Sequence, residues 1–508
     1  MSRLRLALAT AAALAAGSAV IGAAGPAAAA TSDTVYLPAS GSLAVTGHGY
    51  GHGHGMSQYG AQGAALRGGS AATILAFYYP GTVASTVPSA PVRVDVTANA
   101  GLAVTVSWRT GLAVRDAVTG VTSMLPTAFP MWRIGYSVSA GYLLQYLSAS
   151  SWHPYLIYSH PLGFTGPSTI RLWPASAATV NFATVRSAAY RGELRQVWTG
   201  SSLITLNSVV MDAYLLGVVP RESPASFPAA ALQAQAVAAR SYAAYKRASG
   251  TGRSYDVYDT TADQVYGGYA SYASAGAAPV VIEQASTNAA VLATANQVRS
   301  YGGSPILAQF SPSNGGFTAA GGLPYLVAKA DPYEQYSSSP YQTWTGSADV
   351  ASLRDVAGLK TLFRLQVWRE TSAGGHVSSV AFVGTDWSNR SVTVGRTGEQ
   401  VRSYFGWRST YFGFDASGAT DGGPTGPWPL TGSQVFAYAG SSRVINGVPD
   451  SQAQYRPDIA AIQREVGVPQ TSRYDSATWR RVEYWQGLVG LPQNGVVDKV
   501  TWDTMTTR

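Results

Sequence analysis

The chain has 508 residues, no cysteine and a formal net charge of +8 at neutral pH. This length is sufficient for two or more domains, and the missing thiols exclude disulfides, thiolate metal sites and cysteine nucleophiles. A basic chain with 30 tyrosines and 13 tryptophans suits an anionic, sugar-rich partner, because aromatic faces stack on sugar rings and positive charge attracts polyanions. Lysine and arginine form no basic run, which argues against a nucleic-acid partner.

The N-terminal residues have the pattern of a secretory leader. Arg3 and Arg5 precede an alanine-rich apolar run that ends with alanine at positions 28–30. We interpret residues 1–30 as a signal peptide cleaved before Thr31; a retained membrane anchor is the alternative. The mature protein is therefore expected to be secreted and, once the leader is removed, to have no membrane partner.

The next segment alternates glycine with larger residues. Residues 45–60 read VTGHGYGHGHGMSQYG, with glycine at every odd position from Gly47 to Gly55. As a strand, this segment would carry its histidines on one face and bare backbone on the other, which is useful where a ligand or another backbone approaches closely. A flexible linker is the alternative. Ser57 is expected to be the N-cap of a short helix that follows.

The rest of the chain predicts an α+β fold. A second short helix follows Ser70, and residues 91–209 contain short apolar runs typical of antiparallel strands. The best helix is Ala229–Lys246, which follows Pro228 and ends near Gly250. Strands and turns are expected over 277–322, and a hairpin with a small helix over 362–414. A Gly/Pro/Thr linker at 415–433 precedes a small module, 434–508, with three predicted helices.

The stretch GVVPRESP contains the candidate catalytic carboxylate, Glu222. Pro220 and Pro224 flank it, so we expect a stiff loop between an apolar β-run and the alanine-rich helix. An apolar setting raises the pKa of a carboxyl group and makes it a general acid near neutral pH. The alternative is a surface glutamate that favours the helix N-terminus.

The histidines of the glycine-rich segment raise the possibility of a metal site. His48, His52 and His54 would share one strand face, but no Asp, Glu or Cys accompanies them, and neighbours on one face rarely converge on one ion. A Ser-His-Asp site is also disfavoured, because no GxSxG elbow surrounds Ser57. We expect neither a metal nor another cofactor.

Several long motifs together resemble the SpoIID/LytB family of peptidoglycan-active sporulation and amidase-enhancer proteins. They are YLLGVVPRESPASFPAAALQAQAVAARSYA, YDVYDTTADQVYGG, FSPSNGGFT and GHGYGHGHGMSQYGAQGAA, and they span most of residues 46–414. The resemblance implies an antiparallel β-rich domain with the alanine-rich helix beside an active-site cleft. Its residue ranges are 31–414 for the whole domain, 91–210 for the β-rich part and 211–414 for the catalytic core.

The resemblance also implies roles for single residues. The family's catalytic glutamate falls on Glu222, and the remaining motif positions, expected to bind substrate, are His52, Ser57, Gln58, Arg240, Asp259, Gln264, Tyr266, Ser313 and Asn314. Some family members bind zinc through Cys, His and Cys, but Tyr258, Ala262 and Asp263 stand at those places here. The resemblance therefore carries no zinc site over to this chain.

The order of the motifs differs from that of the family. The glycine-histidine motif, within residues 46–82, opens the mature chain here, whereas in the family it follows the equivalent of residues 401–414. We infer a circular permutation, in which residues 46–56 pack beside 405–414 and bring His52 and Gln58 toward Glu222. The module at 434–508 is similar to three-helix peptidoglycan-binding domains; a module retained for packing alone is the alternative.

The resemblance implies a secreted, cell-wall-associated lytic transglycosylase whose partner is the peptidoglycan glycan strand. Such an enzyme needs only one carboxyl group, whereas glycoside hydrolases normally use two. Asp256, Asp259 or Asp263 could supply a second carboxylate and make the protein a hydrolase. A non-catalytic enhancer that binds glycan and a cell-wall amidase is the alternative from another class.

Overall fold

The computed structural model describes residues 32–37, 41–176, 179, 181–250, 252–371, 374–415, 436–438, 456–468 and 474–506. The expected signal peptide, residues 1–30, lies outside these ranges, as does the expected linker except for Asp415. Within the described ranges, no helix has the length and apolar character that a membrane crossing requires.

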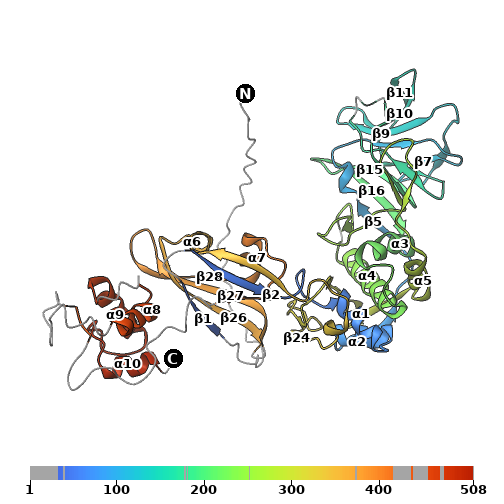
Figure 1. Ribbon diagram of the computed structural model, residues 1–508. Coiled ribbons are helices and arrows are strands. Elements are labelled where there is room, and N and C mark those ends of the chain that lie inside the picture. The colour runs from blue at the N-terminus through green and yellow to red at the C-terminus, as the bar shows by residue number, and fades with distance from the viewer. Residues whose placement is uncertain are drawn as a thin grey trace.

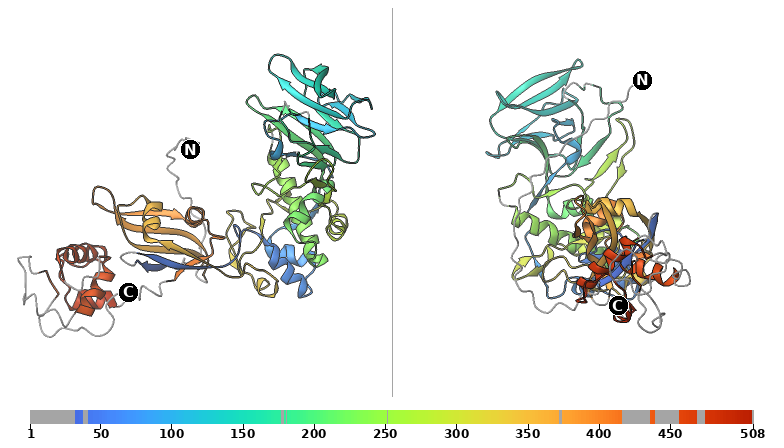
Figure 2. Two further views of the ribbon diagram at one scale, coloured as in Figure 1. Left: turned by 45° about the horizontal axis from the view of Figure 1, so that its top comes forward. Right: turned by 90° about the vertical axis from the view of Figure 1, so that its left-hand side faces the viewer.

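The fold is α+β, as predicted, and its parts follow one another along an elongated molecule (Figure 1). A β lobe stands at one end, and a layer of helices lies beneath it. A sheet lobe follows, and a C-terminal helical module lies at the far end; the turned views of Figure 2 show the same succession.

The β lobe consists of two mainly antiparallel sheets, which confirms the predicted β-structure. Among the described residues, the strand orders are β11-β10-β9-β6-β13-β14-β18-β19 and β17-β5-β16-β15-β12-β7-β8. The alternating burial of Val92 and Val94 on β5 and the fully buried Trp132 on β9 show that the core lies between the sheets. The strands are β5 (Pro91–Asp95), β6 (Val104–Ser107), β7 (Ala113–Asp116), β8 (Thr122–Met124), β9 (Met131–Ser137), β10 (Gly141–Ser148), β11 (Ser151–Tyr158), β12 (Leu162–Thr165), β13 (Ile170–Leu172), β14 (Ser187–Tyr190), β15 (Glu193–Trp198), β16 (Leu203–Val210), β17 (Val257–Tyr258), β18 (Ala270–Tyr272) and β19 (Val280–Val281).

The alanine-rich helix connects this lobe to the helices below it. It is α4 (Ala229–Ser249), with Pro228 and Gly250 at its ends as predicted. Ala236, Ala239 and Ala243 face the core of the β lobe, whereas Leu232 packs into a second core with helices α1 (Gln58–Leu66) and α2 (Ala71–Tyr78). This helix is therefore covered on two sides.

Residues 277–322 contain a helix that the sequence analysis missed. It is α5 (Ala285–Ala293), which packs against α3 (Met211–Glu222) and α4. The expected strands and turns of this range are also present, as β20 (Gln297–Tyr301), β21 (Ser304–Pro305), β22 (Phe310–Ser311) and β23 (Phe317–Thr318). Outside the range lie the short strands β4 (Val83–Thr86) and β24 (Lys329–Ala330) and the 3-10 turns η1 (Thr97–Asn99) and η2 (Glu334–Tyr336).

The glycine-histidine segment is not one continuous strand, which corrects the expectation for residues 46–56. Strand β2 (Ser42–Gly47) ends where the alternation begins, and β3 (Met56–Ser57) starts where it ends. Gly49, Gly51, Gly53 and Gly55 have φ between 65° and 105°, a left-handed conformation that favours glycine. The segment therefore winds as a loop, and its histidines do not share a face.

The expected close approach to the glycine backbone is confirmed, and the approaching group is the chain itself. A Cβ added to Gly55 would lie 2.2 Å from the carbonyl oxygen of Gln309, and one added to Gly53 would lie 2.5 Å from the ring of His376. The two predicted helix caps are also confirmed, because the hydroxyls of Ser57 and Ser70 accept hydrogen bonds from Gly60 N and Thr73 N.

The sheet lobe contains the predicted hairpin and small helix. Residues 42–47 run antiparallel to residues 412–415, with Gly47 opposite Phe412, and His48 N donates to Tyr411 O at 2.8 Å. The predicted packing of the N-terminal motif beside residues 405–414 is therefore confirmed. The elements are β1 (Ser32–Tyr36), β25 (Trp344–Asp349), α6 (Val350–Ala357), β26 (Thr361–Thr371), β27 (Gly374–Thr385), β28 (Ser391–Thr397), α7 (Gly398–Phe405) and β29 (Phe412–Asp415).

The C-terminal module has the three predicted helices, α8 (Arg456–Glu465), α9 (Ser476–Leu488) and α10 (Lys499–Thr506). Its core includes Ile462, Trp485 and Trp502. Gln486 is buried as well, and its amide nitrogen donates to the carbonyl of Val496. These side chains therefore pack the interior of the module.

Candidate active site

Helix α3 carries Glu222 at its last position, which corrects the expected loop. Tyr214, Leu215, Val218 and Val219 lie on one side of a 3.6-residue repeat and are buried, so the apolar run GVV belongs to a helix rather than to a strand. Ser223 ends the helix, and its N–H donates to Val219 O at 2.9 Å. The carboxyl group is therefore fixed to the end of a packed element.

Glu222 is half-buried and each of its oxygens accepts a hydrogen bond. Val265 N donates to Oε1 at 2.7 Å, and the Gln58 amide donates to Oε2 at 3.4 Å. Burial raises the pKa of Glu222 above its ordinary value, although the two hydrogen bonds and the charge of Arg221 oppose this shift. The result is a carboxyl group whose protonated form persists to higher pH than that of a solvent-exposed glutamate.

Gln264 and Tyr266, two of the predicted site residues, stand on either side of Val265 in the chain, and the backbone N–H of Val265 donates to Glu222. The Gln264 side chain accepts from the Tyr214 hydroxyl at 3.0 Å and donates to Ala239 O at 3.3 Å. The Tyr266 hydroxyl donates to Asn207 Oδ1 at 2.7 Å. Both side chains are almost fully buried, so they position Val265 between them and leave little surface for a glycan.

The Ser57-Gln58 pair connects Glu222 to a second buried carboxyl group. While Gln58 donates to Glu222, the Ser57 hydroxyl donates to Glu334 Oε2 at 2.6 Å. The Ser313 hydroxyl donates to Glu334 Oε1 at 2.5 Å. Burial raises the pKa of Glu334 to about 7, against the effect of these hydroxyl donors. Ser57 and Ser313 therefore serve an interior carboxyl group.

Asn314 belongs to the same interior network. Its amide donates to Asp331 Oδ2 at 2.8 Å, and the Tyr78 hydroxyl donates to the same oxygen at 2.7 Å. Ser313 and Asn314 are fully buried, which corrects the expectation that they bind substrate directly. They hold the loop that precedes η2 against helices α1 and α2.

Part of the chain that contains this site is similar to known proteins. Residues 199–301 match the SpoIID family, whose description is stage II sporulation protein. This part of the chain belongs to the SpoIID family. The matched SpoIID segment runs from the end of the β lobe to β20, and it contains Glu222 and the whole of α4.

Relatives of the chain extend this assignment. An amidase enhancer of Bacillus subtilis is 42% identical over 137 residues, 26% of this chain and 16% of the relative. Stage II sporulation protein D of the same organism is 25% identical over 229 residues, 42% of this chain and 63% of the relative. An uncharacterized protein of Brachyspira hyodysenteriae is 37% identical over 86 residues. The chain thus spans less than two thirds of each relative.

Arg240, within the SpoIID segment, lies away from any surface. It is fully buried, and its guanidinium donates to Asp212 Oδ1 at 2.9 Å and to the carbonyls of Val291 and Gln297. The expected contact with substrate does not fit this position, because the side chain joins α4 to α3 and α5. The signal that could have shown this is the alanine-rich surroundings of Arg240, which are typical of a helix covered on most sides.

The three aspartates considered as second carboxylates are all engaged within the protein. Asp259 accepts from the hydroxyl of Thr97 at 2.7 Å, which holds this predicted site residue against the β lobe. Asp256 pairs with Arg93 at 2.6 Å, and Asp263 pairs with Lys246 at 2.7 Å.

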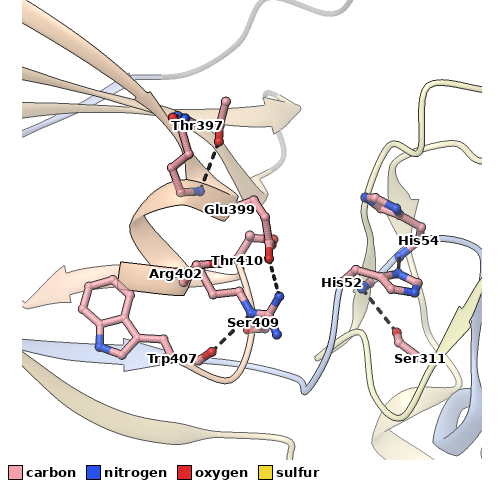
Figure 3. Close-up of polar contacts among 12 residues, drawn as sticks. His52, His54, Ser311, Thr397, Glu399, Arg402, Trp407, Ser409 and Thr410 are labelled. Atoms are coloured by element: carbon pink, nitrogen blue, oxygen red, sulfur yellow. Dashed lines mark hydrogen bonds and ion pairs between the residues drawn. The ribbon is translucent and has the colours of Figure 1, made fainter. Parts of the chain in front are cut away.

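The histidines of the N-terminal motif lie apart from Glu222. The rings of His52 and His54 are 4.8 Å apart. They lie beside Ser311, and Glu399 and Arg402 of α7 lie opposite them (Figure 3). Burial lowers the pKa of His52 to about 3, and the charges of His54 and Arg402 add to this shift. The structure therefore brings Gln58 to Glu222, as expected, but gives His52 other neighbours.

His48 is separate from this pair, since its Nδ1 lies 2.8 Å from Gln342 O and its ring packs on Tyr411. In the part of the chain that the structure describes, no group of three or more His, Cys, Asp or Glu side chains could hold a metal ion.

Sequence reasoning missed Glu334 and Asp331. Both lie in the stretch KADPYEQY, where the two carboxylates flank a Pro-Tyr pair in a chain with only 26 acidic residues. The sequence signal that could have identified them is the presence of carboxylates close to tyrosines. What could not be read from the sequence is their contact with Ser57 and Tyr78, which lie more than 250 positions away.

Proposed function

We propose that the protein is a lytic transglycosylase that cleaves peptidoglycan glycan strands with Glu222 as its acid and base. The observation that carries the proposal is the half-buried carboxyl group of Glu222, whose oxygens accept from Val265 N–H and from the Gln58 amide. A carboxyl group with a raised pKa can donate a proton near neutral pH.

In the proposed reaction, Glu222 protonates the glycosidic oxygen between N-acetylmuramic acid and N-acetylglucosamine. The bond from that oxygen to the anomeric carbon of the muramic acid breaks. The carboxylate then takes the proton of the muramic 6-hydroxyl as that oxygen attacks the anomeric carbon, which gives a 1,6-anhydro end. The proton is returned to Glu222, so one carboxyl group suffices and no water is consumed.

The engagement of the nearby aspartates favours this reaction over hydrolysis. A hydrolase needs a second carboxylate to activate water or to form a covalent intermediate. Asp256 and Asp263 are held in ion pairs, and Asp259 is bonded to Thr97.

A second candidate function is supported by one specific finding. The relative named amidase enhancer is 42% identical over its matched 137 residues. In this alternative, the protein binds glycan and stimulates a cell-wall amidase without cleaving the strand itself. Both candidates place the protein outside the cell at the wall, which agrees with the proposed signal peptide. Both are also compatible with the proposed circular permutation and with wall binding by the C-terminal module.

Digestion of purified cell walls tests the proposal. The wild type should release muropeptides with 1,6-anhydro ends, identified by mass spectrometry, and Glu222→Gln should lower their release by at least 100-fold. Asp355→Asn, which changes an exposed carboxylate on α6, should match the wild type.

Other products would redirect the assignment. Reducing ends would indicate a hydrolase. No cleavage together with stimulation of an added amidase would establish the enhancer. Anhydro products that persist in Glu222→Gln would remove Glu222 from the mechanism.

A further inference from the structure

Four aromatic rings form a continuous row, and two of them, Phe227 and Tyr59, follow closely in the chain on Glu222 and on its hydrogen-bond partner Gln58. Phe227, Tyr59, Tyr341 and Tyr50 follow one another, with centroid separations of 5.3, 6.0 and 4.9 Å. Phe227 lies in the turn that leads from Glu222 to α4. Tyr59 follows Gln58, whose amide donates to the Glu222 carboxylate. The row therefore leads away from the proposed reacting group.

The rings of this aromatic row come from separate segments that the fold brings together. Gly49 N donates to Tyr341 O at 2.8 Å, which joins the glycine-histidine loop to the segment after η2. Tyr59 N donates to Pro312 O at 3.0 Å. Backbone hydrogen bonds thus fix the positions in the fold from which the rings of Tyr341 and Tyr59 extend.

The three tyrosines of the aromatic row reach solvent, whereas Phe227 does not. Tyr50 is 42% exposed, Tyr59 and Tyr341 are partly exposed, and Phe227 is the buried end. Within the described residues, the hydroxyls of the three tyrosines have no hydrogen-bond partner in the protein. A tyrosine with an exposed ring and a free hydroxyl can contact the apolar face of a sugar and hydrogen-bond its hydroxyl groups.

A cation lies over the outer part of the row. The Arg408 guanidinium is 5.8 Å from the centroid of the Tyr341 ring, and the side chain is exposed. Among the described residues, Arg408 makes no ion pair. An exposed arginine without an ion pair is suited to a carboxylate on a ligand that lies along the aromatic row.

We propose that Tyr59, Tyr341 and Tyr50, with the buried Phe227 packed behind Tyr59, form a glycan subsite that holds sugar rings of an amino-sugar polymer leading to Glu222. Arg408 contacts a carboxylate substituent of that polymer. The choice of polymer rests on the proposed function, because the row is continuous with the residues around Glu222.

Binding measurements on Glu222→Gln test the subsite without cleavage. Calorimetry with peptide-free peptidoglycan glycan strands should show at least tenfold weaker binding when Tyr341→Ala is added. Tyr341→Phe should restore most of the affinity, and Tyr404→Ala, which removes an exposed tyrosine outside the row, should change nothing. If Tyr341→Ala does not fold, judged by circular dichroism, the exposed Tyr50→Ala takes its place with the same expected loss.

A second arm tests the cation. Arg408→Gln should weaken binding of the carboxylate-bearing strands and lower its salt dependence, but leave binding of neutral N-acetylglucosamine oligomers unchanged. Equal loss for both ligands would overturn the assigned role of Arg408.

The outcomes separate the subsite from the reaction. Unchanged glycan affinity in both Tyr341→Ala and Tyr50→Ala overturns the subsite even where Glu222→Gln abolishes cleavage. Weaker binding in these variants upholds the subsite even where Glu222→Gln still yields anhydro products. If glycan affinity is unchanged but stimulation of an amidase is lost, the row binds a protein and the proposal is wrong.

Discussion

Burial has different consequences for the two carboxyl groups of Glu222 and Glu334. Glu222 is half-buried with a backbone and an amide donor, whereas Glu334 is 2% exposed and bonded only to hydroxyls of the protein. Both carboxyl groups have a raised pKa because of desolvation. Only Glu222 keeps partial access to solvent, so it alone suits proton transfer to a substrate.

Replacing Gln58 should change the pH dependence of the proposed reaction. The Gln58 amide stabilises the ionised carboxylate and so lowers the pKa of Glu222. Gln58→Leu should raise this pKa, and the alkaline limb of kcat/KM should move to higher pH because the acid stays protonated longer. A pH–rate profile on soluble glycan strands measures the shift. A limb that stays in place or moves to lower pH would contradict the role of Gln58.

Glu334 should make the stability of the fold depend on pH. Its pKa rises from 4.5 to about 7 on folding, so the folded chain holds this proton more tightly than the unfolded chain does. This contribution to stability is fully present below about pH 4.5 and is lost as the pH rises through about 7.

Glu334→Gln, which resembles the protonated side chain, should remove that part of the pH dependence. At pH 8, urea unfolding should show the variant to be more stable than the wild type by on the order of 2 kcal/mol, with little difference at pH 4.5. Equal slopes of stability against pH for both proteins would show that Glu334 does not titrate in this range.

At the scale of elements, glycine has two separate functions in the N-terminal motif. Positive φ at Gly49, Gly51, Gly53 and Gly55 winds the chain between β2 and β3. The missing side chains also allow the segment to lie against residues 309–316 and the ring of His376. This loop leads to Ser57 and Gln58 at the start of α1, whose side chains donate to Glu334 and Glu222.

Gly55→Ala should therefore be strongly destabilising. Its φ is +65°, and the added Cβ would lie 2.2 Å from Gln309 O, so strain and a steric clash act together. We expect a loss of about 2–4 kcal/mol in the free energy of unfolding. Gly395→Ala on β28 is the control, because its Cβ would meet no atom within 4 Å, and its effect should stay within about 0.5 kcal/mol. Similar losses for both variants would contradict this explanation.

At the scale of the whole molecule, the sheet lobe contacts both the N-terminal strand β2 and the C-terminal module. Strand β2 lies between β25 and β29, so residues near both ends of the proposed SpoIID-like domain share one small sheet. The C-terminal module contacts the same lobe through Arg481, whose guanidinium lies 4.0 Å from the centroid of the Phe363 ring. Burial lowers the pKa of Arg481 to about 10.

Phe363→Ala should loosen the C-terminal module. The substitution removes the cation–π contact, worth about 0.5–2 kcal/mol, and the packing of Phe363 against Gly467. We expect small-angle scattering to show a larger radius of gyration than for the wild type. Trp387→Ala, which removes a 75% exposed side chain on the same lobe, should leave it unchanged. An unchanged radius in Phe363→Ala would mean that other contacts hold the module.

The sequence by itself determined the local features of this protein. The caps at Ser57 and Ser70, helix α4 with its terminal Pro228 and Gly250, and the antiparallel strands of the β lobe depend on neighbours in the chain. Propensity, capping and periodicity act over a few residues, so these features could be predicted.

Only the tertiary structure decided which motif residues reach Glu222. Arg240, Gln264, Tyr266, Ser313 and Asn314 are buried, and the row of aromatic rings comes from three segments far apart in the chain. The winding of the glycine-histidine loop also depends on residues 309–316, about 260 positions away. Burial and such long-range contacts arise from the packing of whole elements against one another, which no short stretch of sequence encodes.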